Sequence, residues 1–474
     1  MPLTGTKPRQ GDVANLIRIA AVLCAVALAL EPLAGQGGAR ADHIRVGTQV
    51  RKPNVLVIMT DDQRVGTMKV MPATKRLIAG KGVTFRNAHA TTPLCCPSRA
   101  STMTGQYAHN HMVRRNGDRD RLTMSHTLQH DLQGAGYLTA IVGKFFNGWN
   151  LKSMPPDFNQ ASLLGAAGSR FSSKPTDGYT RSVVSINGRL RIVSRYSTDF
   201  LAKRAIKTMS KFNRHDRRPW LMYVNTYAPH SPFIPASRHR GTRVPGLHNT
   251  PAVRERDRRD KAPEVRRQQV NRPWMPIAAK KQQRSLMAVD ELVARVFRKL
   301  RRQRELNDTL VIFLSDNGFL LGEHGLTTKR WPYRHSTGVP LMMRWPGHIR
   351  KGTQDGRLVA NIDIAPTVYD AAMVEPDHDI DGRSLLKRGR RRELLLENWE
   401  GTRWASLRSK RYQYIEYYSR GGDRLLFREL YKLRRDPWQL KNVLWRNGDR
   451  YKDTVRRLHS RLAKAVTCKT QACP

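Results

Sequence analysis

Two pairs of polar residues each come close behind a short apolar run. Asp61 and Asp62 follow the first run, and Asp316 and Asn317 follow the second. Runs of this kind predict buried parallel strands, and ligands bind beyond the carboxyl ends of such strands, so the two pairs are expected to meet in space. Their oxygens suit a hard cation such as calcium or magnesium better than zinc. Either pair alone could equally be a turn or a helix cap.

A cysteine pair is a third candidate for chemistry. Cys95 and Cys96 are followed by Pro-Ser-Arg, in which the arginine is Arg99, and a helix is predicted over 98–104. Cys95 should therefore lie near a helix N-terminus, a position that favours anionic groups. A single cysteine there could be a small buried residue or a thiol nucleophile.

Strand-like and helix-like segments alternate along the chain, which predicts an α/β fold that would place these residues at one sheet edge. The predicted strands are 54–59, 139–142, 220–225, 309–314 and 339–343. The predicted amphipathic helices are 197–209 and 286–300.

Two later regions depart from this alternation. Residues 238–284 are rich in Arg, Pro and Gln with little periodicity, which predicts a long surface excursion. Beyond about Asp381, short alternating segments at 404–407 and 411–418 predict strands, and Leu462 falls in a terminal helix. We therefore predict a large α/β domain at 42–380 and a smaller C-terminal α+β domain at 381–474.

The segment Cys-x-Pro-Ser-Arg at 95–99 resembles the signature of type I sulfatases, and further motifs occur in the order found in that family. These motifs are Lys52-Pro-Asn54, Gly136-Tyr-Leu-Thr139, Gly143-Lys144, Ala228-Pro-His230, Asp316-Asn-Gly318, Gly322-Glu-His-Gly325, Lys329, Pro340, Asp363-Ile-Ala-Pro-Thr367, Asp381-Gly-Arg-Ser384, Glu429-Leu-Tyr431 and Asp436-Pro437. The context of Cys95 is most similar to the branch that contains N-acetylglucosamine-6-sulfatases and heparan-type sulfatases.

This resemblance implies an alkaline-phosphatase-like core with a large mixed, mostly parallel sheet flanked by helices. It implies that a formylglycine-generating enzyme oxidises Cys95 to an aldehyde, whose hydrate attacks the ester sulfur and later expels sulfate. Arg99 would stabilise the charge of the hydrate, and calcium would act as Lewis acid. The implied ligands of one calcium ion are Asp61, Asp62, Asp316, Asn317 and the modified residue 95.

Lys144, His230 and Lys329 match the positions that contact the sulfate group in the family, and His230 or Lys329 would protonate the leaving oxygen. Many members also carry a histidine after Gly-Lys-x, which this chain lacks. Asn147 matches the asparagine of the glucosamine-sulfatase branch and is expected only to orient substrate, because an amide is not a strong base.

A second departure from the family follows Tyr333. Relatives usually carry two acidic residues there, whereas this chain has Arg334 and His335. The pair is expected to make the local wall basic, so substrate preference cannot simply be carried over.

Basic residues outnumber acidic ones by 85 to 38, giving a formal net charge of +47. Such a field attracts polyanions. The arginines are spread along the chain, and neither zinc-finger spacing nor an aromatic RNA-binding motif is present, so no specific nucleic-acid partner is expected. The charge fits a solvated surface as well as a sulfated or phosphorylated polymer substrate.

The N-terminus is typical of an export signal. Basic residues precede an apolar run at 19–30, and Ala39-Arg-Ala41 offers a cleavage site before Asp42. The run is shorter than the roughly 20 residues that span a bilayer, so residues 1–41 predict export to the cell envelope or exterior without a stable membrane anchor. An oxidising compartment would permit a small disulfide between Cys468 and Cys473.

The residues and the resemblance together predict a sulfuric ester hydrolase that acts on a sulfated carbohydrate. A phosphonate monoester or phosphodiester hydrolase remains an alternative, because similar sites with the same cysteine signature cleave phosphorus esters. An alternative of another class is a catalytically inactive protein that binds polyanions.

Overall fold

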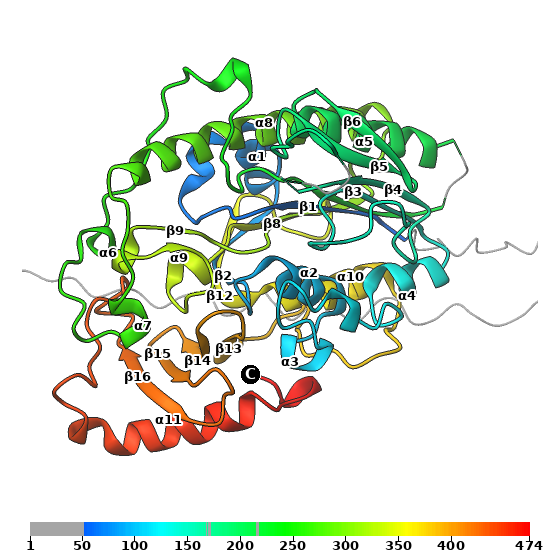
Figure 1. Ribbon diagram of the computed structural model, residues 1–474. Coiled ribbons are helices and arrows are strands. Elements are labelled where there is room, and N and C mark those ends of the chain that lie inside the picture. The colour runs from blue at the N-terminus through cyan, green and yellow to red at the C-terminus, as the bar shows by residue number, and fades with distance from the viewer. Residues whose placement is uncertain (1–51, 167, 169–171, 215–217) are drawn as a thin grey trace, which may run out of the picture. The chain divides into compact units, whose positions relative to one another are not determined.

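A ten-stranded mixed sheet organises the larger part of the protein (Figure 1). The computed structural model describes residues 52–166, 168, 172–214 and 218–474, so the predicted export signal and its cleavage site at Ala41 lie outside the described residues. The strand order is β12-β2-β11-β8-β1-β7-β3-β4-β5-β6. The strands are β1 (Asn54–Thr60), β2 (Val83–His89), β3 (Leu138–Gly143), β4 (Gln160–Leu164), β5 (Ser182–Ile186), β6 (Arg189–Val193), β7 (Trp220–Asn225), β8 (Thr309–Ser315), β11 (Leu341–Arg344) and β12 (Thr353–Ala360).

The central strands β8, β1, β7, β3 and β4 run parallel. They are apolar along most of their length because helices cover both faces of the sheet. On one face, α5 (Ser197–Phe212) and α8 (Trp274–Arg302) pack against Leu56 and Ile58, and on the other face α2 (Cys95–Thr104) and α10 (Ile364–Ala372) pack against Val57. Figure 1 shows the two helical layers on either side of the sheet.

The C-terminal part is a four-stranded antiparallel sheet with one covering helix, α11 (Lys452–Ala465). Its strands are β13 (Glu393–Asn398), β14 (Arg403–Ser409), β15 (Gln413–Tyr418) and β16 (Leu425–Tyr431). Leu458 and Leu462 of α11 share an apolar core with Trp404 of β14 and with Leu358 of β12. The predicted α/β core and smaller C-terminal α+β domain are therefore both present, while a boundary at 381 stays a prediction.

The predicted excursion at 238–284 is partly wrong. The stretch from Trp274 onward belongs to α8, while α6 (Pro251–Arg254) and α7 (Pro263–Arg266) are single turns within the irregular remainder. The first turns of α8, before the predicted start at 286, were missed because they bury the polar Gln282 and Gln283 while Ile277 is exposed, so the 3.6-residue apolar period is weak there.

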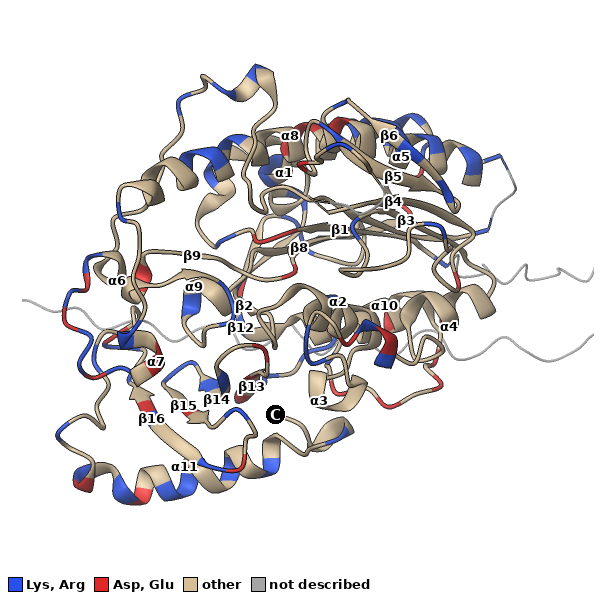
Figure 2. Ribbon diagram, viewed as in Figure 1, with Lys and Arg blue, Asp and Glu red and all other residues tan. Residues whose placement is uncertain are grey.

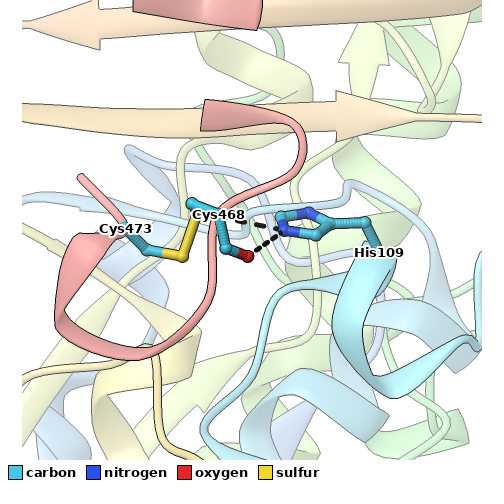
Figure 3. Close-up of side chains that lie close together, drawn as sticks. All are labelled: His109, Cys468 and Cys473. Carbon is cyan, nitrogen blue, oxygen red and sulfur yellow. Dashed lines mark hydrogen bonds between the residues drawn. A yellow bond between two sulfur atoms is a disulfide. The ribbon is translucent and has the colours of Figure 1, made fainter. Parts of the chain in front are cut away.

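A disulfide closes a short loop near the C-terminus. Cys468 and Cys473 form a disulfide (Figure 3). Nε2 of His109, from α3 (Ala108–His111), lies 2.9 Å from the carbonyl oxygen of Cys468, so the terminal segment is held against the larger part.

Basic side chains are spread over the ribbon, most visibly along α8 and α11 (Figure 2). Within the described residues, no helix is both long and apolar enough to cross a membrane.

Candidate active site

The two acidic strand ends meet as the sequence predicts. β1 and β8 are adjacent and parallel, with Thr60 opposite Ser315, so the residues that follow leave the sheet at the same edge. The amide N–H of Asp62 donates to Oδ1 of Asp316 at 3.1 Å, and the side-chain amide of Asn317 donates to Oδ1 of Asp62 at 2.6 Å. Asp62 has a φ of 65°, a left-handed conformation that Asp adopts more readily than most residues, and this turns the chain back toward Asp316.

Cys95 is the first residue of α2, and its side chain points into this acidic cluster. Its Sγ lies 3.6 Å from Oδ1 of Asp61 and 3.0 Å from Nζ of Lys329. The whole of α2 is buried, so its N-terminal backbone amides act in a region with little water. Residues four apart share one face of a helix, which places Arg99 directly behind Cys95.

Arg99 is fully buried and joins three parts of the site. Its Nε and Nη2 donate to Oδ2 of Asp316 at 3.0 and 2.8 Å, and its Nη1 donates to the carbonyl oxygen of Lys144 at 2.9 Å. Nη2 also lies 3.5 Å from Oδ2 of Asp61. The guanidinium therefore fixes α2 relative to the ends of β1, β3 and β8.

Three further basic side chains come from separate loops. Lys144 follows β3, and its Nζ donates to Oδ2 of Asp61. Nζ of Lys329 donates to Oδ1 of Asp62 at 2.5 Å. Nε2 of His230 lies 3.6 Å from Oδ2 of Asp62, and this side chain is 26% exposed whereas the two lysines are buried. His230 thus lies on the solvent side of the cluster.

The charges of the cluster stabilise one another. Burial alone would raise the pKa of Asp61, but the positive charges of Lys144, His230 and Arg99 outweigh burial and hold that pKa well below its ordinary value. Burial would lower the pKa of Lys144, but Asp61 raises it above the ordinary value. Burial raises the pKa of Cys95 to about 12, so an unmodified side chain is a neutral thiol near pH 7.

The donor set fits a hard divalent cation. One carboxylate oxygen from each of Asp61, Asp62 and Asp316 lies within 4.8 Å of the others. Among the described residues, Oδ2 of Asp62 and Oδ1 of Asn317 are buried without a hydrogen-bond partner. Buried oxygens without partners are costly, and a cation would satisfy both. The donors are all oxygens, which suits calcium or magnesium.

The remaining predicted residues lie differently. The backbone N–H of Asn147 donates to Sγ of Cys96 at 3.2 Å, so this hydrogen bond is made by the main chain of Asn147 and not by its side chain. His335 is buried, and burial lowers its pKa to about 4 despite the neighbouring carboxylate of Glu323. The expectation that Arg334 and His335 together form a basic wall is therefore wrong for His335, which is uncharged near neutral pH.

Several polar residues that support the site were not predicted, and all of them except the half-buried Asn116 are buried. Asn116 accepts the backbone N–H of Cys96 at 3.0 Å, and Asn225 donates to the carbonyl oxygen of Lys144 at 3.0 Å. Ser98 donates to the carbonyl oxygen of Asp316 and in turn accepts from Asn361 at 3.0 Å. Asn225 could have been found, because it ends a predicted strand as Asp61 and Asp316 do. Ser98 belongs to the Cys-x-Pro-Ser-Arg segment, whereas Asn116 and Asn361 carry no such signal.

The large mixed sheet flanked by helices is the alkaline-phosphatase-like fold that the sequence predicts, with an oxygen-donor cluster and a helix N-terminus at its carboxyl edge. The Sulfatase family model matches residues 53–374, and the model "N-sulphoglucosamine sulphohydrolase, C-terminal" matches residues 322–467. The chain belongs to the sulfatase family, as its motifs predicted.

Two relatives illustrate the branch. The extracellular sulfatase SULF-1 homolog of Drosophila melanogaster is 33% identical over 365 residues, which are 71% of this chain but only 31% of that protein. The N-acetylglucosamine-6-sulfatase of Homo sapiens is 31% identical over 415 residues, which are 81% of this chain and 71% of that protein. The chain thus spans under a third of the Drosophila relative and over two thirds of the human one.

Solved structures confirm the predicted fold. A protein solved with its substrate D-glucosamine-2-N,6-O-disulfate has a TM-score of 0.75 at 24% identity, over 87% of this chain and 97% of that one. The phosphonate monoester hydrolase of Agrobacterium radiobacter has a TM-score of 0.62 at 22% identity, over 86% of this chain and 96% of that one. Because both share the fold, the fold alone does not separate sulfate from phosphonate chemistry.

Proposed function

We propose that this protein is an exported sulfatase that hydrolyses sulfate esters of a carbohydrate, with formylglycine made from Cys95 and with calcium. The observation that carries the proposal is the position of Cys95. It lies at a buried helix N-terminus, 3.0 Å from Lys329 and one turn before Arg99, beside a cluster of carboxylates. Lys329 and the backbone amides of the helix N-terminus would act as donors to an oxygen on the modified residue at this position.

The metal and the modification each have a defined place in this proposal. Asp61, Asp62, Asp316, Asn317 and residue 95 would hold calcium, which would draw electron density from a sulfuryl oxygen. Hydrated formylglycine would supply the nucleophilic hydroxyl that a neutral thiol does not. The formylglycine-generating enzyme is the maturation partner that this proposal requires.

The protein's own side chains then have separate tasks. Arg99 holds residue 95 and Asp316 in register through its forked hydrogen bonds. Lys144 and Lys329, each already bonded to an aspartate, place positive charge where the negative charge of the sulfuryl oxygens would increase.

His230 is better placed than Lys329 to protonate the leaving alcohol. Its Nδ1 lies 2.7 Å from the carbonyl oxygen of Ser231, to which a ring N–H donates, so Nε2 faces the cluster. Its partial exposure leaves room for the alcohol to depart toward solvent. Lys329, in contrast, is buried between Asp62 and residue 95.

The relatives support the substrate class. Several are N-acetylglucosamine-6-sulfatases at about 30% identity, so we propose a sulfated amino sugar, in monomeric or polymeric form. Extracellular sulfatases among the relatives support export. The N-acetylglucosamine-6-O-sulfatase of Bacteroides thetaiotaomicron, 28% identical over 444 residues, supports the same substrate class.

Peptide mass spectrometry and kinetics on protein from its native host test the proposal. We expect the mass decrease of thiol-to-aldehyde conversion at position 95, turnover of an aryl sulfate well above that of an aryl phosphonate, and loss of turnover in Cys95→Ala. Cys96→Ala is the matched control and should remain active. Fully active protein with unmodified Cys95 would refute the mechanism, a preference for the phosphonate would establish the alternative hydrolase, and modified but inactive protein would favour a polyanion-binding protein.

A further inference from the structure

Four arginines and a tryptophan lie on or next to loops that contact the segment around Cys95. We name this set the arginine rim. It consists of Arg114, Arg115, Arg330, Arg403 and Trp399. Trp399 belongs to the hairpin loop between β13 and β14, so the C-terminal sheet contributes directly to this surface.

Hydrogen bonds fix the rim close to Cys95. Glu400, next to Trp399, accepts the backbone N–H of Asn116 at 2.8 Å and lies 3.4 Å from Nη1 of Arg330. Asn116 in turn accepts the backbone N–H of Cys96, and the backbone N–H of Arg330 donates to the carbonyl oxygen of Pro93 at 3.2 Å. The rim is therefore anchored to main-chain groups within two residues of Cys95. The contact of Asn116 with Cys96 supports both the rim and the start of α2.

The rim carries more positive than negative charge. Cζ of Arg114 lies 5.2 Å from the ring centroid of Trp399, Arg115 is exposed, and the Arg330 side chain is 39% exposed. Nε of Arg114 is buried without a hydrogen-bond partner among the described residues. Nη1 of Arg403 donates to the carbonyl oxygen of Gly421, and burial together with the charges of Arg114 and Arg115 lowers the pKa of Arg403, as expected when like charges lie nearby.

The acidic groups nearby do not neutralise this set. Glu400 is shared between Arg330 and the backbone of Asn116. Asp118 accepts the backbone N–H of Arg114 at 3.2 Å rather than pairing with its guanidinium, and Asp423 offsets only part of the charge near Arg403. Arginines held together against their repulsion are the arrangement that binds anions, since the planar guanidinium donates two parallel hydrogen bonds to a sulfate or a carboxylate.

We propose that the arginine rim binds a second anionic group, a sulfate or a carboxylate, on the sugar next to the one whose sulfate ester is cleaved. This inference rests on the proposed function, and it makes the substrate an oligosaccharide with at least two anionic groups. The lysines of the cluster, beside Asp61 and Asp62, are assigned to the sulfate group that is cleaved, so a second anionic group needs other donors. Trp399 would pack against the apolar face of a sugar ring beside the arginines.

The test compares a double variant, Arg114→Gln with Arg115→Gln, with a matched control, Arg388→Gln with Arg390→Gln. The control removes the same charge from exposed residues of another loop. The substrates are an aryl sulfate and three disaccharides in which 6-O-sulfated glucosamine is joined to a 2-O-sulfated uronate, an unsulfated uronate or a neutral hexose.

We expect the rim variant to raise KM about 10- to 100-fold for at least one of the two uronate substrates, which is the effect of lost hydrogen bonds to charged groups, with aryl sulfate turnover unchanged. An effect on the 2-O-sulfated substrate alone would identify sulfate as the ligand, and an effect on both would identify the carboxylate.

If the rim variant lost activity equally on all four substrates, or on none of them, the proposed role of the arginine rim would be wrong. So would an equal loss in the control, because that would reflect overall charge. Calorimetric binding of the 2-O-sulfated disaccharide to Cys95→Ala protein, with and without the two rim substitutions, gives a result that does not depend on turnover. A wild-type protein that binds the disaccharide through the rim but cleaves no sulfate ester would refute the proposed function while leaving the rim in place.

Discussion

Replacing Arg99 by lysine tests whether the site depends on the forked geometry of this side chain or only on its charge. Arg99 bonds Asp316 twice and the carbonyl oxygen of Lys144 once, all at 3.0 Å or less. A lysine ammonium is a compact point charge and cannot span these acceptors. In Arg99→Lys, Asp316 would keep at most one of its two bonds, and the carbonyl oxygen of Lys144 would lose its guanidinium donor.

The expected cost follows from the number of bonds lost. Hydrogen bonds to charged groups contribute about 1.5–3 kcal/mol each, so losing two should lower the free energy of unfolding by about 3–6 kcal/mol. That is a large part of the roughly 5–15 kcal/mol by which most proteins are stable. Because Asp316 would no longer be held in register with residue 95, kcat should also fall by about 10²- to 10³-fold.

Arg391→Lys is the matched control. Arg391 is equally buried and donates two hydrogen bonds to Asp363, at 2.6 and 2.7 Å, but it contacts none of the site residues described above. Urea unfolding monitored by tryptophan fluorescence should show a similar destabilisation in both variants, and only Arg99→Lys should lose aryl sulfate turnover per folded molecule. If Arg99→Lys stayed within about threefold of the wild-type kcat, or if both variants lost kcat equally, the role given to the guanidinium fork would be wrong.

Three other predictions address the metal, a buried carboxyl group and the disulfide. Treatment with a calcium chelator should abolish aryl sulfate turnover, and calcium should restore it better than zinc because the donors are oxygens; full recovery with zinc alone would contradict this. Burial raises the pKa of Glu429 from its ordinary 4.5 to about 7, against the opposing effect of Lys261. The stability that the protonated form confers is therefore present below about pH 4.5 and lost as the pH rises through 7. In the wild-type protein, the free energy of unfolding in urea should fall by up to about 3 kcal/mol between acidic and mildly alkaline pH because of this group, and in Glu429→Gln that fall should be absent. An unchanged pH profile in that variant would exclude this carboxyl as its source. Replacing Cys468 and Cys473 by serine should cost about 2 kcal/mol in the same measurement, because the closed loop is short, and a much larger loss would mean that the sulfurs have another role.

The sequence by itself determined the chemistry-bearing positions of the sheet. The apolar runs before Asp61 and Asp316 have the composition of buried parallel strands, and the ends of such strands converge by the geometry of the fold, so their meeting could be predicted. The helix after Cys95 was predicted over 98–104, whereas α2 begins at Cys95 itself, and this earlier start places Cys95 and Arg99 on one helix face. These inferences use local pattern alone, which is why they transfer from sequence to structure.

Only the tertiary structure decided the rest, because the remaining contacts join segments with no shared pattern. Asn116 supports the site from a turn and Asn361 from a short 3-10 helix after β12, and no periodicity marks either one. The charge of His335 could not be read from its residue type, since burial and not composition lowers its pKa. The placement of Trp399 beside Arg114 likewise depends on how the C-terminal hairpin packs. Local pattern fixes what each segment can be, whereas burial and long-range packing fix which charges meet.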